Sequence, residues 1–225
     1  MGTSNPQAPL HLLWIGHSHL RCVRAAADEG AQPLQAQGVQ IKTLVLNQTQ
    51  YEPHFTPATP GGAPGTLHLA RQEELLQRSA VADAVVRASF AATDLFRHQS
   101  ALRRFLPGVL KRPLVHVESP SPPRQAQHLL RHGGFYTEQI AARGVAPAEL
   151  RRKLWRLHSH LVAPDCEAAD IEFIRVPQTV VDADGFIQPA SLAEDPTHAN
   201  PWYGRRLIEQ LVRRHRPAFA FPDAP

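Results

Sequence analysis

Two short segments, near the two ends of the chain, contain the residue types of nucleophilic hydrolysis. Residues 16–20 (GHSHL) follow an apolar run, and residues 195–200 (DPTHAN) precede the last expected helix. A serine hydroxyl becomes a nucleophile when a histidine takes its proton and a carboxylate holds the other ring nitrogen of that histidine. Asp195 and His198 are close enough in sequence for such a pairing on a turn, which leaves Nε2 of His198 for the proton of Ser18. The two segments together predict a catalytic triad.

Each segment also has an ordinary structural interpretation. A serine after a strand is often the N-cap of the following helix, and residues 195–200 are equally a capped entry to the last helix, with Thr197 or Asn200 as the cap. The tripeptide His-Ser-His occurs again at residues 158–160. There Ser159 falls inside a helical pattern, where a hydroxyl bonds back to the preceding turn, and we interpret that tripeptide as helix surface.

The histidines near Ser18 raise a metal-site alternative. His17, His19 and His198, with Asp195 as a fourth ligand, would form a donor set that zinc or iron accepts. The compact helical spacings of paired histidine ligands do not occur in this sequence, however. We therefore expect no metal and no other cofactor, and we expect His17 and His19 to shape or line the pocket.

The segments between these residues alternate short apolar runs with longer helical patterns. That alternation is typical of crossover units that build a parallel sheet. Strands are expected at residues 10–15, 39–46, 83–89, 113–118 and 171–176, and helices at 18–28, 69–79, 94–106, 123–132, 147–162 and 201–215. The predicted fold is an α/β three-layer sandwich, α/β/α, with about five parallel strands. Ligands of such sheets bind beyond the carboxyl ends of the strands, which is where Ser18 follows the first strand.

Length and composition favour one domain over residues 1–225. The chain has 225 residues, of which 43% are hydrophobic and 20% charged, and this is enough for a sizeable core. Residues 47–66 are rich in proline and glycine and are expected to form a long functional loop, whereas residues 217–225 are expected to be a peripheral tail. Cys22 and Cys166 lie far apart in sequence, which favours reduced structural thiols.

Charge and hydropathy limit the partners of the protein. The net charge of +4 comes mainly from arginines dispersed along expected helices, and only 7% of the residues are aromatic, so we expect no binding to nucleic acid. The first residues lack the pattern of a secretory signal, and no segment has the length of a membrane span. The expected location is the cytoplasm, without membrane association, and the oligomeric state stays open.

The residue pattern of the two segments resembles that of the SGNH, or GDSL-type, hydrolase family. The resemblance consists of Gly-x-Ser-His after the first strand and of a later block whose matching residues are Asp195, Thr197, His198, Asn200, Tyr203 and Gly204. It implies a flavodoxin-like sandwich, with Ser18 as nucleophile, His198 as general base and Asp195 as its orienting partner. It also implies hydrolysis of an ester, thioester or other acyl group without a metal, often of acetyl esters on carbohydrates.

The sequence departs from the family where an oxyanion would be bound. His17 stands where the family usually has an aspartate. The family binds the oxyanion with the serine N–H, a glycine N–H and an asparagine side chain. In this chain the candidates for the glycine are Gly61, Gly62 and Gly65. Residues 91–94, where the asparagine would be expected, read AATD and contain none. Thr93 and Asn47 are the candidate replacements, and losing one donor lowers turnover by roughly 100- to 1000-fold.

Two functions are therefore expected from the sequence. The first is a serine hydrolase that cleaves an ester or acyl bond of a small molecule or saccharide through an acyl-enzyme. The alternative is a binding or regulatory module that keeps the fold without efficient catalysis, because the third-block asparagine is missing.

Overall fold

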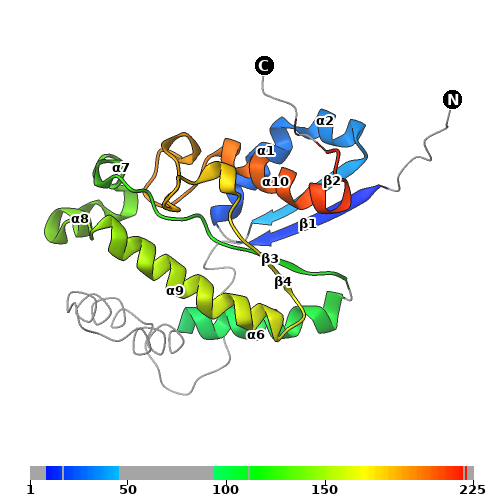
Figure 1. Cartoon of the computed structure of the whole chain (residues 1–225), viewed down its shortest axis with the longest axis horizontal. Helices are drawn as coiled ribbons and strands as arrows, with labels where there is room; N and C mark the ends of the chain where they lie inside the picture. The colour runs from blue at the N-terminus through cyan, green and yellow to red at the C-terminus, as the bar shows by residue number, and fades with distance from the viewer. Residues whose placement is uncertain (1–8, 17, 46–93, 111, 220, 222–225) are drawn as a thin grey trace. The chain divides into compact units, whose positions relative to one another are not determined.

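A computed structural model describes residues 9–16, 18–45, 94–110, 112–219 and 221 of the chain (Figure 1). The expected strand at 83–89, the expected helix at 69–79 and the long loop at 47–66 lie outside these residues. The described strands are β1 (Leu10–Gly16), β2 (Val39–Val45), β3 (Val115–Val117) and β4 (Glu172–Ile174). The described α-helices are α1 (Arg21–Glu29), α2 (Ala31–Ala36), α6 (Asp94–Leu110), α7 (Ala126–Arg131), α8 (Thr137–Arg143), α9 (Ala148–Glu167) and α10 (Pro201–His215). Short 3-10 helices are η1 (Ser18–Leu20), η2 (Gly134–Tyr136), η3 (Gln178–Val180) and η4 (Pro189–Ser191).

Helix bounds differ from expectation at several places. The prediction for α10 is confirmed in full, because Pro201 at its start and the basic last turn followed by Pro217 are strong boundary signals. The expected helix at 94–106 instead continues to Leu110, with Pro107 inside it. Helices α2 and α8 were not predicted, because each is only one to two turns long and has too few residues to show a clear apolar periodicity.

The described strands pair in parallel. β1 pairs with β2 from Leu10↔Val39 to Gly16↔Val45, and β3 pairs with β4 from Val115↔Glu172 to Val117↔Ile174. These pairs form two two-stranded sheets among the described residues. The fold is therefore a mixed α/β fold with parallel strands, as expected, while the five-stranded three-layer sandwich stays a prediction.

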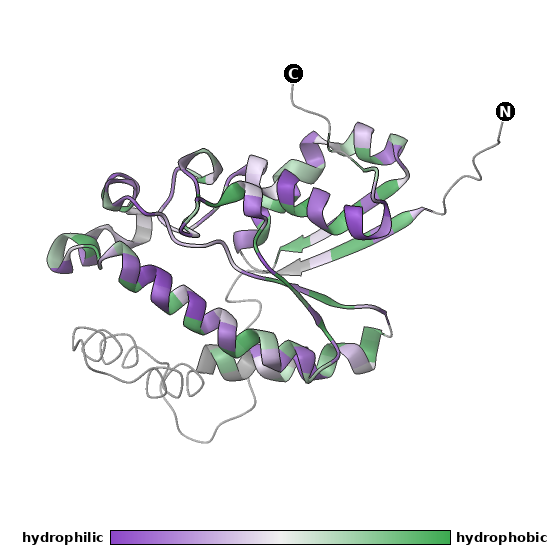
Figure 2. Cartoon of the chain, in the orientation of Figure 1, coloured by the Kyte–Doolittle hydropathy of each residue, from purple (hydrophilic) through white to green (hydrophobic). Residues whose placement is uncertain are grey.

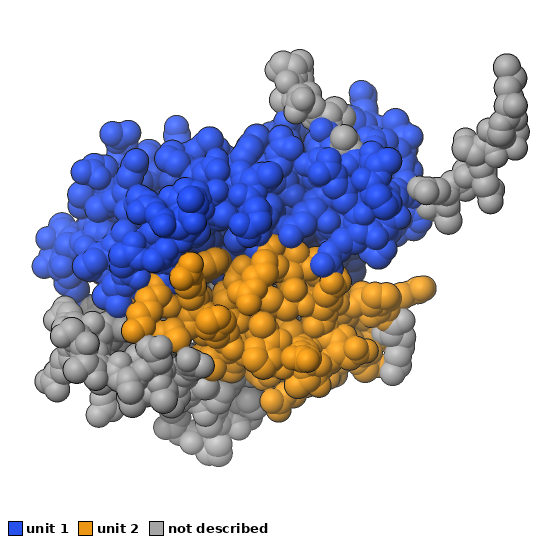
Figure 3. Space-filling model, in the orientation of Figure 1, with its two compact units in different colours: residues 1–48, 119–152, 176–225 blue, residues 49–118, 153–175 orange. Residues whose placement is uncertain are grey.

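The chain divides into two compact units (Figure 3). Unit 1 consists of residues 1–48, 119–152 and 176–225, and unit 2 of residues 49–118 and 153–175. The single domain over residues 1–225 stays a prediction. All the described residues of the expected triad belong to unit 1.

The core of unit 1 is built around the contact between α1 and α10. Val23 and Ala26 of α1 and Ile208 and Val212 of α10 are almost completely buried. The two helices approach very closely at Gly204, where a Cβ atom would lie 2.2 Å from the carbonyl oxygen of Cys22. Glycine is required there because no larger residue fits against the α1 backbone.

The β1–β2 sheet of unit 1 is rich in apolar side chains (Figure 2). Trp14 and Val39 point into the core, whereas Leu13 and Leu44 are largely exposed. Side chains alternate between the two faces of a strand, so one face of this sheet packs on the core of the unit.

The end of the chain buries two aromatic rings, although residues 217–225 were expected to be peripheral. Phe219 and Phe221 are 3% and 7% exposed, and their rings meet edge to face. A Cβ atom on Gly30 would lie 2.3 Å from the Phe221 ring, so this ring packs at the junction of α1 and α2. The expectation rested on the prolines of the segment and overlooked the apolar rings between them.

Unit 2 has its own small core, formed by Val162 and Cys166 of α9 and by Ile171 just before β4. Beside it, the guanidinium of Arg103 on α6 pairs with the Asp165 carboxylate of α9, with Nε and Oδ2 2.6 Å apart, and the Arg103 side chain is only 5% exposed. Such a pair holds two helices in a fixed relation, because separating its members would leave a buried charge uncompensated.

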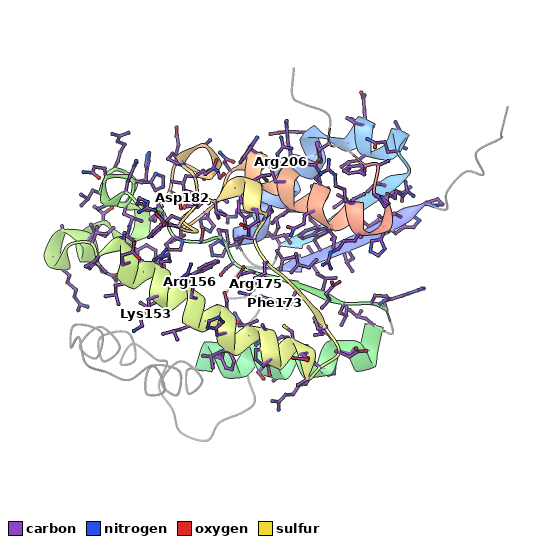
Figure 4. All side chains as sticks on the ribbon, viewed as in Figure 1. Lys153, Arg156, Phe173, Arg175, Asp182 and Arg206 are labelled. Atoms are coloured by element: carbon purple, nitrogen blue, oxygen red, sulfur yellow. The ribbon has the colours of Figure 1, made fainter. Side chains whose placement is uncertain are left out.

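Polar and aromatic side chains of β3, β4 and the residues that follow these strands also contact one another in unit 2. Phe173 and Arg175 are labelled in Figure 4, and the guanidinium of Arg175 lies 5.4 Å from the centre of the Phe173 ring. Arg175 also donates to the buried Glu118 carboxylate at 3.2 Å. His116 stacks on the same ring, with centroids 5.6 Å apart.

Neither cysteine is in a disulfide, and both are buried, as expected for structural thiols. None of the described helices combines the length and the apolar character needed to span a bilayer.

Candidate functional site

Ser18 lies at the carboxyl end of β1, where the sequence placed it. β1 ends at Gly16, and the 3-10 helix η1 begins at Ser18 and leads directly into α1. The N-cap residue of α1 is Leu20, whose side chain makes no capping hydrogen bond. The side chain of Ser18 lies outside the described part of the structure, so its interpretation as a helix cap stays untested.

Asp195 and His198 form the carboxylate–imidazole pair that their spacing predicts. Nδ1 of His198 lies 2.9 Å from Oδ1 of Asp195. The same oxygen also accepts the backbone N–H groups of Thr197, at 2.9 Å, and of His198, at 2.7 Å. A carboxylate oxygen accepts only, so Nδ1 of His198 carries the hydrogen and the neutral ring leaves Nε2 as an acceptor.

The environment of Asp195 keeps its carboxyl group ionised. Burial alone would raise its pKa, but the N–H groups of Thr197 and His198 and the attraction of the His198 ring outweigh burial and hold the pKa below the ordinary value. Asp195 is thus a stable negative partner for an imidazole that gains a proton during a reaction.

The His198 ring lies beside the segment that contains Ser18. Nε2 of His198 is buried and has no hydrogen-bond partner among the described residues. The ring of His19, the residue after Ser18, lies with its centroid 4.8 Å from the His198 ring centroid, at an angle of 48°. The fold therefore brings together the two segments that lie near opposite ends of the sequence.

The loop that carries the pair is closed by hydrogen bonds at its base. The N–H of Ala193 donates to the carbonyl of His198, and the side-chain amide of Asn200 donates to the carbonyls of Ala190 and Leu192. The Asn200 side chain also accepts the N–H of Tyr203 as the N-cap of α10. The helix-cap interpretation of this segment is thus confirmed for Asn200, and the carboxylate–imidazole pair exists beside it.

A second helix contributes to this loop in a way that the sequence did not predict. Nε2 of His128 on α7 lies 2.8 Å from the backbone carbonyl oxygen of Asp195. Nothing in the local sequence signals this contact, because the two residues are 67 positions apart and His128 belongs to no motif. Pro196, the next residue of the loop, is buried, and Gly134 of η2 lies close to its ring.

Other predicted site residues fall outside the described residues. These are His17, Asn47, Gly62 and Thr93, together with the glycines at 61 and 65, so the expected oxyanion hole stays a prediction. His19 is described, and it contacts His198 as reported above. Among the described residues, no group of three or more His, Cys, Asp or Glu side chains is arranged to hold a metal ion.

The second serine of the repeated tripeptide is not on the surface of its helix. Ser159 is 1% exposed, whereas His160 beside it is exposed. The prediction of helix surface is wrong for Ser159, because it lies on the inner face of α9 with Val162 and Cys166. A buried hydroxyl inside a helix is nevertheless unsuited to attack a substrate.

Cys22 lies close to the same segment but is unsuited to nucleophilic attack. Its Sγ donates to the carbonyl of His19 at 3.1 Å. Burial raises the pKa of its thiol to about 12, so the thiolate does not form at neutral pH. Ser18 is the better nucleophile candidate in this region.

Comparison with known proteins adds distant similarities only. No protein-family model and no curated protein sequence matches the chain. One similar solved structure is a GDSL-like lipase from Bacteroides thetaiotaomicron, with 14% identity over 93% of this chain and 89% of that chain and a TM-score of 0.44. Another is a "putative acylhydrolase" from Bacteroides fragilis, with 12% identity over 94% of this chain and 92% of that chain and a TM-score of 0.44. Similarity at this distance carries no argument about what the chain does.

Proposed function

We propose that the protein is a serine hydrolase that cleaves an ester or other acyl bond through an acyl-enzyme. Ser18 is the nucleophile, His198 the general base and acid, and Asp195 the carboxylate that orients His198. The substrate class is an acetyl or short acyl ester on a carbohydrate or small metabolite.

The observation that carries this proposal is the hydrogen bonding of the two nitrogens of the His198 ring. Its Nδ1 is held at 2.9 Å by an ionised carboxylate, and its Nε2 is buried without a partner among the described residues. The contact between His19 and His198 supports a position of Ser18 near that nitrogen. The resemblance of both segments to the SGNH family supports the same roles.

The reaction follows from these roles. Nε2 of His198 takes the proton of Ser18 Oγ as this oxygen forms a bond to the substrate carbonyl carbon. The tetrahedral intermediate collapses, and the alcohol leaves with the proton from His198. Water then attacks the acyl-enzyme, gives a proton to His198 and releases the acid, while Ser18 regains its proton. Backbone N–H of Ser18, the N–H of Gly62 and the side chain of Thr93 or Asn47 are the proposed oxyanion donors.

A fluorophosphonate probe tests the nucleophile directly, because it reacts with an activated serine. We expect the wild-type protein to be labelled and to hydrolyse p-nitrophenyl acetate, and Ser18→Ala to abolish the labelling and to reduce hydrolysis by roughly a thousandfold or more. Ser159→Ala is the matched control. It removes a serine from the same His-Ser-His tripeptide and should leave labelling and turnover unchanged.

Absence of labelling and of ester hydrolysis in the folded wild-type protein would overturn the proposal and leave the binding module as the better interpretation. Loss of activity after treatment with a chelator, with its return on addition of metal, would instead favour the metal-site alternative. Hydrolysis rates for acetyl, butyryl and octanoyl esters of p-nitrophenol then define the acyl chain.

A further inference from the structure

The loop that carries Asp195 and His198 is held in different ways at its base and at its tip. At the base, backbone and side-chain bonds join residues 190–193 to residues 198–200. At the tip, the partners of the Asp195 carboxylate among the described residues are Thr197 and His198 of the same loop. In the described part of the chain, the side chain that reaches the tip from another helix is His128, through the carbonyl of Asp195.

The hydrogen bond from His128 has a definite direction. A backbone carbonyl accepts only, so Nε2 of His128 carries the hydrogen. The donor lies on α7, one turn before His132, whose ring centroid is 4.9 Å from that of His128.

The peptide group that receives this bond belongs to the residue that orients the general base. A rotation of the Asp195 peptide would move the Asp195 side chain and therefore the ring of His198. A shift of about 1 Å in a catalytic group can cost on the order of 100-fold in rate. The bond from His128 opposes such a rotation from outside the loop.

We propose that His128 is a positioning residue, which fixes the Asp195–His198 pair by donating a hydrogen bond to the Asp195 carbonyl. This inference rests on the proposed hydrolase function for its kinetic consequence but not for its structural one. His128 touches no reacting atom, and its effect is on kcat rather than on KM.

The kinetic test compares three variants. His128→Leu removes the donor and should lower kcat about 10- to 100-fold, with KM nearly unchanged and with the same fall in the rate of fluorophosphonate labelling. His128→Gln retains an N–H donor at a similar reach and should restore most of the lost rate. His132→Leu is the control, because it removes the neighbouring ring but no hydrogen bond to the loop, and it should lower kcat less than threefold.

A readout that is independent of activity separates this inference from the proposed function. Long-range ¹H–¹⁵N NMR assigns the protonated nitrogen of each histidine, and we expect Nε2–H for His128 and Nδ1–H for His198 at high pH. In His128→Leu the His198 signals should shift or broaden, and in His128→Gln they should return toward the wild-type positions. This result supports the inference even if the wild-type protein hydrolyses no ester.

Two results would overturn the inference. One is wild-type kcat together with unchanged His198 signals in His128→Leu. The other is an equal loss in His128→Leu and His128→Gln, or in His128→Leu and His132→Leu, which would indicate packing rather than the hydrogen bond. Thermal unfolding of each variant identifies any that does not fold. If His128→Leu does not fold, the His198 NMR signals of His128→Gln, the most conservative variant, decide: signals near the wild-type positions support the inference, and shifted signals contradict it.

Discussion

One oxygen atom, Oδ1 of Asp195, both builds the turn at residues 195–198 and orients the imidazole of His198. It accepts the N–H groups of Thr197 and His198 and the Nδ1–H of the His198 ring. One acceptor atom thus serves both the turn and the ring. Because the pKa of Asp195 is lowered, its contribution to stability is present above the ordinary carboxyl pKa and is lost as the pH falls through the lowered value.

Asp195→Asn tests the charge of this atom apart from its hydrogen bonds. The side-chain carbonyl of asparagine can still accept the N–H groups of Thr197 and His198, so we expect the variant to fold. The negative charge that stabilises the imidazolium is lost, and kcat should fall by roughly 100- to 10,000-fold. Steady-state kinetics and circular dichroism measure the two effects, and a kcat within threefold of wild type would contradict the role of Asp195.

At the scale of elements, the close packing of α1 on α10 determines where the two site segments meet. η1 leads into α1, and the loop with His198 leads into α10, so the relation between the two helices sets the relation between Ser18 and His198. Gly204 permits the closest approach, because a Cβ atom there would lie 2.2 Å from the carbonyl oxygen of Cys22 and 3.0 Å from Cβ of Ala26.

Gly204→Ala should force these helices apart. We expect a loss of about 1 to 3 kcal/mol in the free energy of unfolding and a clear fall in turnover. The added methyl group meets backbone atoms of α1, which cannot move away without distorting that helix. Gly108→Ala on α6 is the matched control. A Cβ atom at Gly108 meets nothing within 4 Å, and the variant should be more stable by about 0.5 to 1 kcal/mol, as is usual for this exchange inside a helix. Denaturant unfolding of both variants measures the difference, and equal effects would contradict the packing argument.

At the scale of the whole molecule, charge is unevenly distributed between exposed and buried positions. Many arginines are exposed, but unit 2 buries Arg103 and holds the half-buried His116 and His158 near it. The Asp165 carboxylate acts on His116, and the Glu118 carboxylate acts on His158. Burial, and then the positive charges of Arg103 and His158, lower the pKa of His116 to about 4, against a smaller opposing effect of Asp165.

This arrangement predicts that acid destabilises the protein through His116. The pKa is lower in the folded than in the unfolded state, so the unfolded chain binds the proton first, and stability falls as the pH decreases from about 6.5 to about 4. The loss due to His116 is at most about 3 kcal/mol. His116→Phe keeps a ring against Phe173 and removes the titration, so its free energy of unfolding should depend less on pH over this range. Urea titrations at pH 7.5 and pH 5 measure the change, and an unaltered difference between the two pH values would contradict the assignment to His116.

The sequence by itself determined the features that depend on neighbours along the chain. Strong apolar and capping patterns predicted β1 and α10 almost to the residue, because their boundary signals lie inside the elements themselves. The pair of Asp195 and His198 was predictable for the same reason, since a turn of three residues suffices to bring the carboxylate to Nδ1.

Only the tertiary structure decided the contacts between distant segments. The approach of His19 to His198, the bond from His128 to Asp195 and the burial of Ser159, Phe219 and Phe221 have no local signal. Each depends on which helix faces pack together, and this choice minimises the exposed apolar surface of a whole unit rather than of one segment. Two short segments thus contain the reactive residues of the candidate site, while the packing of α1, α7 and α10 determines how those segments are held.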